Sequence, residues 1–371
     1  MRILIDATPL LVRGAGIKSY FDGWIRAILS HHQAGVEVGL YPFLRTLPAL
    51  DHRRSPDTSR SAWWRVLLSN LVSAHVPGAM EHVCRGFDVF HASHHLLRMP
   101  RSAPSTATVF DMTCWLLPQM HTRGNVAATK EYAERTLRRA DRLVAISECT
   151  RLDCARLLAI PEERIDVIYP GVREEFFSVS SQQSASVRDR LGLQRPYVLY
   201  VGCIEPRKNL GRLLDAWAEF HNRHPRDFEL AVAGTPGWET NGILHRLGSS
   251  AGVRWMDYVP EPDLPGLVRG ASALVYPSLY EGFGLPAAQA MAAGVPVITS
   301  NCSCLPEITG GAARLVDPLS QDSITSALEE VLTSPGFQKR LAIAGRKKAE
   351  DYRMTEVAAR SLEFFRRFAG A

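Results

Sequence analysis

Two adjacent cations in the second half of this chain have the type and the setting of a phosphate-binding pair. Arg207 and Lys208 stand side by side in GCIEPRKN (202–209), which follows an apolar run typical of a β-strand. Ligands of parallel α/β sheets bind at the loops that follow the strands, so this loop would bring two permanent cations to such a place. A helix start with solvated charges is the alternative interpretation.

A glycine-rich turn further along supplies complementary chemistry. The stretch YPSLYEGFGLPAAQAMAAGVP (276–296) predicts a strand end, a Gly-Phe-Gly turn and a helix to about residue 293, with Pro286 in its first turn. Backbone amides at that helix start would point at an anion, with Glu281 before them and Gln289 after them. These amides belong to Phe283, Gly284 and Leu285. The order suits one elongated ligand with sugar, diphosphate and ribose in sequence.

Other phosphate-binding patterns are missing from the sequence. It contains no Gly-x-x-x-x-Gly-Lys-Ser/Thr and no Asp-x-Asp, so we expect no metal and no cofactor, with protein cations and amides neutralising any phosphates. Near the N-terminus, RGAGIKS (13–19) has Ser19 where a dinucleotide fingerprint needs a third glycine. Gly14 and Gly16 can still admit an anion or a sugar, or simply form a tight strand-to-helix turn.

Composition limits the class of protein that carries these residues. The chain has 371 residues, of which 46% are hydrophobic and 22% charged, enough for two globular domains. It lacks the run of roughly 18 apolar residues that a membrane span needs. The cysteine number is odd, 7, and a cytoplasmic location is expected. Residues 1–180 have 22 Lys/Arg against 18 Asp/Glu, a mild excess that excludes a nucleic-acid partner but leaves an anionic membrane surface open.

Short apolar runs alternate with amphipathic segments and predict the elements that position these residues. The runs are 2–7, 36–43, 88–93, 107–113, 142–147, 165–171, 197–202, 228–234, 253–259, 273–278, 295–300 and 313–318. The pattern predicts an α/β protein with two doubly wound parallel sheets that face each other across a ligand-binding cleft. A Ser/Gln-rich linker puts the domain boundary at about 178–190, giving domains 1–180 and 190–353.

With these motifs, the chain resembles the retaining GT-B glycosyltransferases of family GT4. The specific motifs are Glu-Gly-Phe-Gly-Leu-Pro (281–286) and Pro-Arg-Lys-Asn (206–209), and the resemblance extends to Asp6 and to residues 109–121, 145–150 and 167–171. It implies an acceptor-binding N-terminal domain, a donor-binding C-terminal domain, and a C-terminal helix, 355–371, that packs back on the N-terminal domain. The apolar positions Val357, Ala358, Leu362 and Phe365 fit one face of that helix.

The resemblance also implies roles for individual residues. Arg207 and Lys208 would bind the diphosphate of a nucleotide sugar, and Glu281 would bind hydroxyls of the donor sugar. Asp111, His121 and the loop with Gly14 and Gly16 would serve the acceptor or the reacting centre. Further donor-binding residues would be Gly202, Glu205, Asn209, Gly282, Phe283, Gly284, Leu285 and Gln289.

Two positions depart from the family pattern. Relatives usually have glutamate at position 289, where it receives both ribose hydroxyls, and glutamine would hold them less tightly by on the order of 1 kcal/mol. Many relatives have His-Asp where this chain has Phe110-Asp111. His121 could compensate, although a surface or core histidine is an equal alternative.

The N-terminal half contains two further candidate segments. RSAWWRVLLSNL (60–71) combines tryptophans, arginines and an apolar face, which suits peripheral contact with the inner face of the plasma membrane or packing on its own sheet. His91, His94 and His95 cluster without a metal-ligand spacing.

The sequence therefore predicts a metal-independent retaining hexosyltransferase for surface polysaccharide synthesis. Bacterial mannosyltransferase-like relatives favour GDP-mannose as donor, and the acceptor would be a glycan or a lipid-linked sugar. A sugar-nucleotide epimerase or hydrolase on the same fold remains an alternative. A nucleotide-sugar binding protein without turnover is another, because of Gln289 and Phe110.

Overall fold

The computed structural model describes most of the chain. The residues it describes are all except 12–15, 32–34, 43, 45–46, 48–63, 65–67, 69–70, 72–74, 77, 94–98, 102, 239, 241 and 370–371. They form two compact units, unit 1 with residues 1–171 and 354–371, and unit 2 with residues 172–353.

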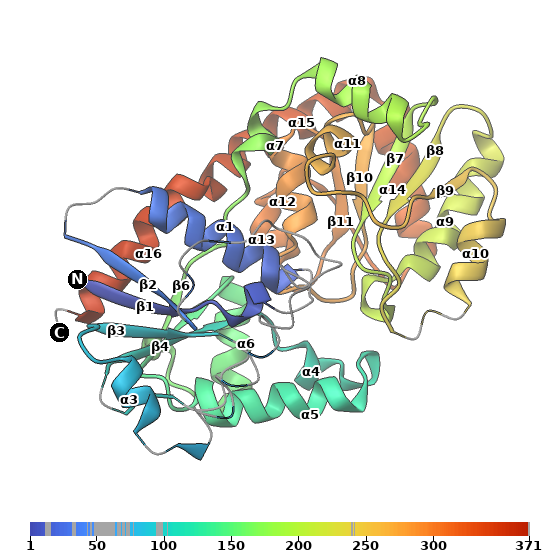
Figure 1. Cartoon of the computed structure of the whole chain (residues 1–371). Helices are drawn as coiled ribbons and strands as arrows, with labels where there is room; N and C mark the ends of the chain where they lie inside the picture. The colour runs from blue at the N-terminus through green and yellow to red at the C-terminus, as the bar shows by residue number, and fades with distance from the viewer. Residues whose placement is uncertain are drawn as a thin grey trace. The chain divides into compact units, whose positions relative to one another are not determined.

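Unit 1 contains a parallel sheet, for which six strands are described, in the order β2-β1-β3-β4-β5-β6 (Figure 1). The strands are β1 (Arg2–Asp6), β2 (Glu37–Tyr41), β3 (Val89–Ala92), β4 (Ser105–Val109), β5 (Arg142–Ala145) and β6 (Ile165–Val167). The helical segments described are η1 (Thr8–Leu11), α1 (Gly16–Ser30), α3 (Ala79–Val83), α4 (Thr113–Leu116), η2 (Pro118–Met120), α5 (Arg123–Tyr132), η3 (Ala133–Leu137), α6 (Glu148–Leu158), η4 (Glu162–Arg164) and α16 (Met354–Ala369).

Unit 2 contains a second parallel sheet, also with six strands described, in the order β12-β11-β10-β7-β8-β9. Its strands are β7 (Tyr197–Val201), β8 (Glu229–Ala233), β9 (Val253–Trp255), β10 (Ala273–Tyr276), β11 (Val297–Ser300) and β12 (Arg314–Val316). The helical segments described are α7 (Glu174–Ser178), α8 (Ser181–Arg190), η5 (Pro206–Lys208), α9 (Leu210–Arg223), α10 (Ile243–Ser249), α11 (Leu264–Arg269), α12 (Leu285–Ala292), α13 (Leu305–Thr309), α14 (Gln321–Thr333), α15 (Pro335–Ala349) and η6 (Glu350–Tyr352).

Every strand pairing described in the two sheets is parallel, as the alternation of apolar runs predicted. Central strands such as β4, β8 and β10 are buried along their whole length, because helices cover both faces of a doubly wound sheet. The predicted fold class, two doubly wound α/β sheets, is therefore confirmed.

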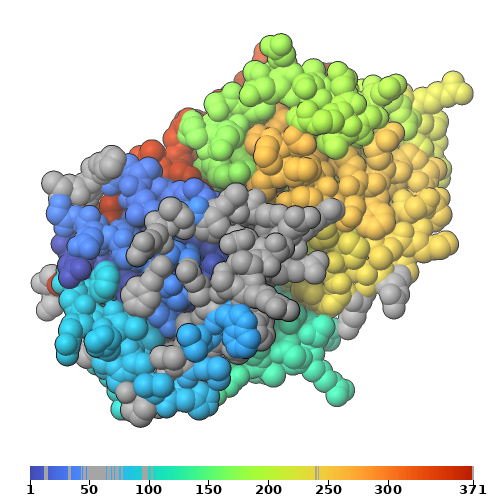
Figure 2. All heavy atoms as spheres, viewed as in Figure 1, coloured from blue at the N-terminus to red at the C-terminus, as the bar shows by residue number. Residues whose placement is uncertain are grey.

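The Ser/Gln-rich stretch that we expected to be a linker is a helix instead. In α8 the Ser180 hydroxyl accepts from the Gln183 amide, and the Gln183 side chain accepts from the Ser180 amide, a reciprocal cap that satisfies two helix-end donors. Ser184 and Val187 are buried while most other residues of α8 are exposed, and the helix lies on the surface of unit 2 (Figure 2). The units divide at residues 171 and 172, before this helix rather than within 178–190.

Helix α16 completes unit 1 from the far end of the chain. It packs along α1, and Figure 1 shows the two helices side by side. The indole N–H of Trp24 in α1 donates to the Ser361 hydroxyl over 2.8 Å, and the Phe365 ring lies 6.1 Å from the indole. Burying such aromatic side chains contributes roughly 1.5–3 kcal/mol each, so α16 is part of the core of unit 1.

Candidate functional site

The strand order of unit 2 reverses between β7 and β10. The chain moves outward from β7 to β8 and β9 on one side, and from β10 to β11 and β12 on the other. Ligands of open α/β sheets bind at the carboxyl ends of the strands where the order reverses in this way. Both sequence motifs follow the strands at this reversal, since 202–209 follows β7 and 277–289 follows β10.

The loop after β7 is held in place by Asn209. This residue adopts φ +59°, an uncommon left-handed conformation that lets η5 turn directly into α9. Its side-chain amide donates to the carbonyl of Pro277 over 3.0 Å and to that of Pro318 over 2.7 Å. The loop that carries Arg207 and Lys208 is therefore tied to the loops that follow β10 and β12.

A close backbone contact shapes the start of this loop. Gly202 has φ +156°, and its carbonyl oxygen would lie 1.9 Å from a Cβ atom placed on Gly234 at the end of β8. A glycine at position 234 is therefore needed for the two strand ends to approach each other.

Lys208, after β7, and Glu281, after β10, bring their side chains together. The Lys208 ammonium donates to Glu281 Oε1 over 2.6 Å, and the Tyr276 hydroxyl donates to the same oxygen over 2.8 Å. The ammonium also donates to the Tyr276 hydroxyl oxygen. All three side chains are buried, so these bonds act in a medium of low polarity.

Arg207 completes the network from the other side of the carboxylate. One of its terminal nitrogens lies 3.0 Å from Glu281 Oε2 and donates to the Tyr280 carbonyl over 2.8 Å. The other donates to Glu205 Oε1 over 2.5 Å. Two cations and two carboxylates thus balance each other, which makes their burial tolerable.

The charges of this network shift the pKa values of its members. Burial alone would raise the pKa of the Glu281 carboxyl, but Lys208 and Arg207 outweigh burial and lower it to about 2. The pKa of Lys208 lies below its usual range, because burial and the neighbouring Arg207 disfavour the ammonium more than the carboxylates favour it. Glu281 is consequently ionised at any physiological pH.

The turn before α12 requires glycine at position 284. Gly284 is the N-cap of α12 with φ +86°, and a Cβ atom there would lie 2.6 Å from the side chain of Leu305. The turn puts the start of α12 directly after Glu281, and within this first turn the amides of Ala287 and Ala288 donate to the Gly284 carbonyl over 3.0 Å and 3.3 Å. Gln289 follows in the second turn and is 8% exposed, and the Phe283 ring packs edge-on against Tyr352 at 5.3 Å. Gly282 lies in the same turn, after Glu281.

The remaining predicted site residues belong to unit 1. Asp111 Oδ1 accepts from the Thr113 amide over 3.0 Å and from the Thr113 hydroxyl over 2.5 Å, so it is held against the first residue of α4. His121 follows η2 and is half-buried. Gly16 is the exposed first residue of α1, and Gly14 lies outside the described residues.

Phe110 occupies an aromatic environment at the position where many relatives have histidine. Its ring meets Tyr20 edge-on at 5.2 Å and lies 5.9 Å from Phe21, both in α1. An apolar ring fits this neighbourhood, whereas a charged imidazole would lose hydration there.

The strand order of unit 1 also reverses, between β1 and β3. Asp6, at the end of β1, is fully buried and accepts hydrogen bonds from the amides and hydroxyls of Thr8 and Ser93. His91 in β3 is equally buried, with its ring nitrogens 2.8 Å and 3.0 Å from the hydroxyls of Thr106 and Thr108. Burial lowers the pKa of His91 to about 3, so it is a neutral core residue. His94 and His95 lie outside the described residues.

Sequence reasoning missed two residues that touch Glu281. Tyr276 looked like the ordinary end of a buried strand, and Ser303, whose hydroxyl accepts from the Glu281 amide over 3.1 Å, lies in an unremarkable loop. The motif Tyr-Pro directly before the glycine-rich turn is the one signal that could have identified Tyr276.

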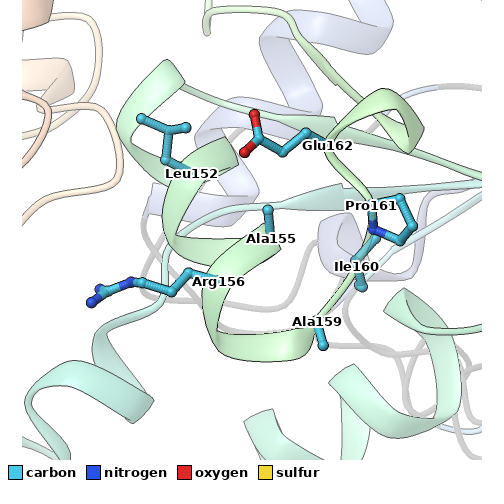
Figure 3. A pocket seen from close by; sticks show the side chains of 7 residues that line it. All are labelled: Leu152, Ala155, Arg156, Ala159, Ile160, Pro161 and Glu162. Atoms are coloured by element: carbon cyan, nitrogen blue, oxygen red, sulfur yellow. The ribbon is translucent and has the colours of Figure 1, made fainter.

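A shallow hollow of about 410 Å³ lies at the end of α6 in unit 1 (Figure 3). Leu152, Ala155 and Ala159 line it together with Pro161 and Glu162. The carboxyl end of α6 leads into β6, so the hollow lies at the amino-terminal edge of the sheet. Ligands of such sheets bind at the opposite edge, and the hollow is not part of the site.

Of the stretch 60–71, the structure describes Trp64, Leu68 and Leu71, and all three are exposed. Within the described part of the chain, no helix is long and apolar enough to span a membrane. The same part holds no group of three or more His, Cys, Asp or Glu side chains arranged to bind a metal ion.

Two Rossmann-like sheets, the second with a buried network of charged side chains beyond its strands, are the features of the GT-B class of sugar-transferring enzymes. The family model described as Glycosyl transferases group 1 matches residues 183–348, and the model Glycosyltransferase Family 4 matches residues 28–176. The chain therefore belongs to glycosyltransferase family 4 and is a glycosyltransferase, as the sequence motifs predicted.

Individual relatives agree with this assignment. The O-antigen chain mannosyltransferase B of Escherichia coli is 30% identical over 71% of this chain and 68% of its own length. The MMP alpha-(1->4)-mannosyltransferase of Mycolicibacterium hassiacum is 30% identical over 63% of this chain, but only 56% of its own length is matched. Sucrose-phosphate synthase from Thermosynechococcus elongatus has the same fold, with a TM-score of 0.72, 20% identity and coverage of 100% and 99% of the two chains.

Proposed function

We propose that this glycosyltransferase moves a mannosyl residue from GDP-mannose, with retention of the anomeric configuration, to a glycan or a lipid-linked sugar during surface polysaccharide synthesis. The observation that carries the proposal is the buried network of Lys208, Arg207 and Glu281 beside the amino end of α12. Names of relatives support mannose, since both curated relatives above are called mannosyltransferases.

In this proposal the network stabilises the charge of the departing nucleotide. Lys208 and Arg207 would contact the diphosphate, because guanidinium and ammonium groups form strong charge-assisted bonds with phosphate oxygens. The amides of Phe283, Gly284 and Leu285 would complete the stabilisation without a metal ion. Glu281 would accept hydrogen bonds from hydroxyls of the donor sugar.

The surrounding residues would shape the rest of the donor site. Gln289 would engage the ribose, Glu205 would orient Arg207, and Asn209 would keep the loop in register with β10. Backbone groups of Gly202 and Gly282 would approach the ligand closely, since neither residue has a Cβ atom. Asp111, His121 and the loop with Gly14 and Gly16 would serve the acceptor from unit 1.

The proposed reaction is tested by incubating the protein with GDP-mannose and octyl α-D-mannoside in EDTA, and following mannosyl transfer by mass spectrometry. Parallel reactions contain UDP-glucose, ADP-glucose or dTDP-glucose. We expect transfer from GDP-mannose, and an α-linked product by NMR. Transfer from another sugar nucleotide would correct the donor, and an inverted product would contradict retention.

The alternatives make different predictions in the same assay. An epimerase or hydrolase would consume the sugar nucleotide equally well without acceptor. A binding protein without turnover would bind GDP in calorimetry and transfer nothing. Either outcome would replace the transferase proposal.

Variants of the network test the location of the donor site. We expect Lys208→Met and Glu281→Gln each to lower kcat/KM by about 100-fold or more, because each removes a charge at the reacting centre. Lys348→Met is the matched control, since Lys348 forms an exposed ion pair with Asp351 in the same unit. If Lys208→Met and Glu281→Gln both keep the kcat/KM of the parent, this placement of the donor site is refuted.

We also propose a peripheral membrane contact through the part of unit 1 that carries Trp64, Leu68 and Leu71. Their helical spacing of four and three residues puts them on one face, and they are exposed by 56%, 61% and 47%. The sequence from 42 to 78 has five arginines and two aspartates, which favours an anionic bilayer. A lipid-linked acceptor would be presented at such a surface.

Vesicle flotation tests this contact. The protein should float with phosphatidylglycerol-containing vesicles, and Trp64→Ser with Leu68→Ser should weaken the association. Leu319→Ser is the matched control, because Leu319 is an exposed leucine, 69% accessible, in unit 2. Equal flotation of the double variant and the control would exclude this face as the membrane contact.

A further inference from the structure

Tyr276 lies at the junction between the two groups to which the proposed function assigns the diphosphate and the sugar. Its hydroxyl donates to Glu281 Oε1 over 2.8 Å and accepts from the Lys208 ammonium. The Lys208 nitrogen also lies 5.0 Å from the centre of the Tyr276 ring. The three side chains therefore form a closed triangle of hydrogen bonds.

The protonation states of the three side chains agree with the directions of these hydrogen bonds. Glu281 is ionised and can only accept, the ammonium of Lys208 can only donate, and a neutral phenol does both. Burial is the main cause that raises the pKa of Tyr276 well above its usual value, with the Glu281 charge adding to it, so the phenol keeps its proton. Neither phenylalanine nor an aliphatic side chain could bridge the two charged groups.

The triangle restricts the ammonium more than a single ion pair would. Two N–H groups of Lys208 are directed at the oxygens of Tyr276 and Glu281, which fixes the direction of the third. A lysine without such restraint would rotate about its four-carbon stem and would lose more entropy when it binds a phosphate.

A neighbouring tyrosine provides an internal comparison. Tyr200, at the end of β7, is also fully buried, and its ring lies 6.3 Å from that of Tyr276. Its hydroxyl has no hydrogen-bond partner among the residues that the structure describes. Two tyrosines of equal burial thus differ in whether the hydroxyl joins the charged network.

We propose that Tyr276 is a positioning residue, whose hydroxyl holds the ammonium of Lys208 and the carboxylate of Glu281 in the relative placement that transfer requires. The inference rests on the proposed donor site and adds to it a residue outside both family motifs. Tyr276 itself does not touch the donor in this scheme and acts through its two partners.

The test compares Tyr276→Phe with Tyr200→Phe, using GDP-mannose and octyl α-D-mannoside, or whichever donor the comparison above selects. We expect Tyr276→Phe to lower kcat about tenfold or more while KM for the donor changes less than about threefold, because positioning is felt most in the transition state. Tyr200→Phe should keep kcat within about twofold of the parent. Equal effects of both variants would overturn the inference.

The pH dependence of kcat gives a second readout that a merely structural role would not move. The phenol oxygen favours the charged form of Lys208, so its loss should shift the alkaline limb of the profile to lower pH. Other groups that bear on this ammonium are Arg207, Glu205, Glu281 and Cys203. They are unchanged in both variants, so an unshifted limb in Tyr276→Phe would contradict the inference.

A triple variant separates this inference from the proposed function. If Tyr276 acts through Lys208 and Glu281, adding Tyr276→Phe to a chain that carries both Lys208→Met and Glu281→Gln should lower the rate by less than about another twofold. Full additivity would overturn the inference. Parent rates in Lys208→Met and Glu281→Gln would instead refute the donor site itself. If Lys208→Met and Glu281→Gln lose activity while Tyr276→Phe keeps the parent rate, only the role of Tyr276 is refuted.

Thermal unfolding checks that the variants fold. Should Tyr276→Phe be too unstable for kinetics, Tyr276→Gln and Tyr276→Leu repeat the comparison, since of these two only glutamine can hydrogen-bond both partners. Glutamine should then be several-fold more active than leucine. Equal rates for that pair would overturn the inference.

Discussion

Gln289 occupies a buried position in the second turn of α12, where relatives usually have glutamate. A carboxylate there could accept from both ribose hydroxyls, whereas the amide has one accepting oxygen. We predict that Gln289→Glu tightens GDP binding by on the order of 1 kcal/mol at pH 8. The gain should shrink at pH 6, because burial favours the protonated carboxyl.

Titration calorimetry with GDP at the two pH values measures this effect. Gln182→Glu, on the exposed face of α8, is the matched control and should leave the affinity unchanged. Weaker binding by Gln289→Glu at pH 8 would mean that the glutamine amide itself donates to the ligand. We expect no similar gain in binding from Phe110→His, at the other position that differs from the family pattern. The ring at position 110 lies among the aromatic side chains of α1.

His91 predicts how the stability of unit 1 depends on pH. Its pKa is about 3 in the folded chain against 6.5 for a free histidine, so the unfolded state binds a proton first as the pH falls. Its contribution to stability is complete above about pH 6.5 and falls by about 1.4 kcal/mol per pH unit between 6.5 and 3.

Urea unfolding at pH 7, 6 and 5, followed by tryptophan fluorescence, tests the contribution of His91. His91→Gln can still reach the threonine hydroxyls but does not titrate, so its stability should depend less on pH than that of the parent. His245→Gln, at an exposed histidine, should keep the parent slope. If the unfolding free energy of His91→Gln changes with pH as steeply as that of the parent, other groups control acid unfolding.

At the residue scale, the sequence identified charges better than neutral partners. It singled out Arg207, Lys208 and Glu281 as donor-site candidates, because adjacent cations and a carboxylate beside a helix start suit few other purposes, and the structure brings these side chains together. It did not single out Tyr276, because a tyrosine at the end of a buried strand is usually a core residue. The contacts of Tyr276 depend on the distance between β7 and β10, which the local sequence does not encode.

At the scale of elements, the turn before α12 depends on glycine for two separable reasons. Gly284 combines a positive φ with a Cβ position 2.6 Å from Leu305, whereas Gly311 has a similar φ of +80° and nothing within 4 Å. We predict that Gly311→Ala costs only the backbone strain, about 1–2 kcal/mol. Gly284→Ala should cost more and should also displace the amides of the first α12 turn.

Thermal unfolding and GDP binding distinguish the two substitutions. Gly311→Ala should lower stability while GDP binding stays intact. Gly284→Ala should weaken GDP binding about tenfold or more. Similar losses of affinity in both variants would show that the contact with Leu305 is not what fixes the turn.

The elements themselves were predictable where apolar runs are short and bounded. Each of the twelve candidate runs overlaps one of the strands β1 to β12, because buried parallel strands need continuous apolar residues. Helix α8 was missed because serine and glutamine dominate it and only Ser184 and Val187 face inward. The reciprocal cap between Ser180 and Gln183 was the overlooked signal.

At the scale of the whole molecule, the proposed donor site lies entirely in unit 2. We predict that GDP slows amide hydrogen exchange in residues 202–209 and 281–289, because bound ligand stabilises the loops that contact it. The sheet of unit 1 should exchange at the same rate with and without GDP. Mass spectrometry of peptides after exchange makes the measurement.

Lys208→Met serves as the control for this experiment. It should abolish the protection in both segments at the same GDP concentration. Protection confined to unit 1 would reverse the assignment of donor and acceptor to the two units.

The position of α16 has a consequence for the order in which the protein matures on the ribosome. All of unit 2 comes from one continuous segment, 172–353, whereas unit 1 needs α16, which is synthesised after unit 2. Until that helix emerges, Trp24 lacks both the Ser361 hydroxyl and the Phe365 ring. The nascent chain therefore completes its second unit before its first. A chain that ends just after residue 353 would have a complete unit 2, but the aromatic side chains of unit 1 that α16 normally covers would be exposed and prone to aggregate without a chaperone.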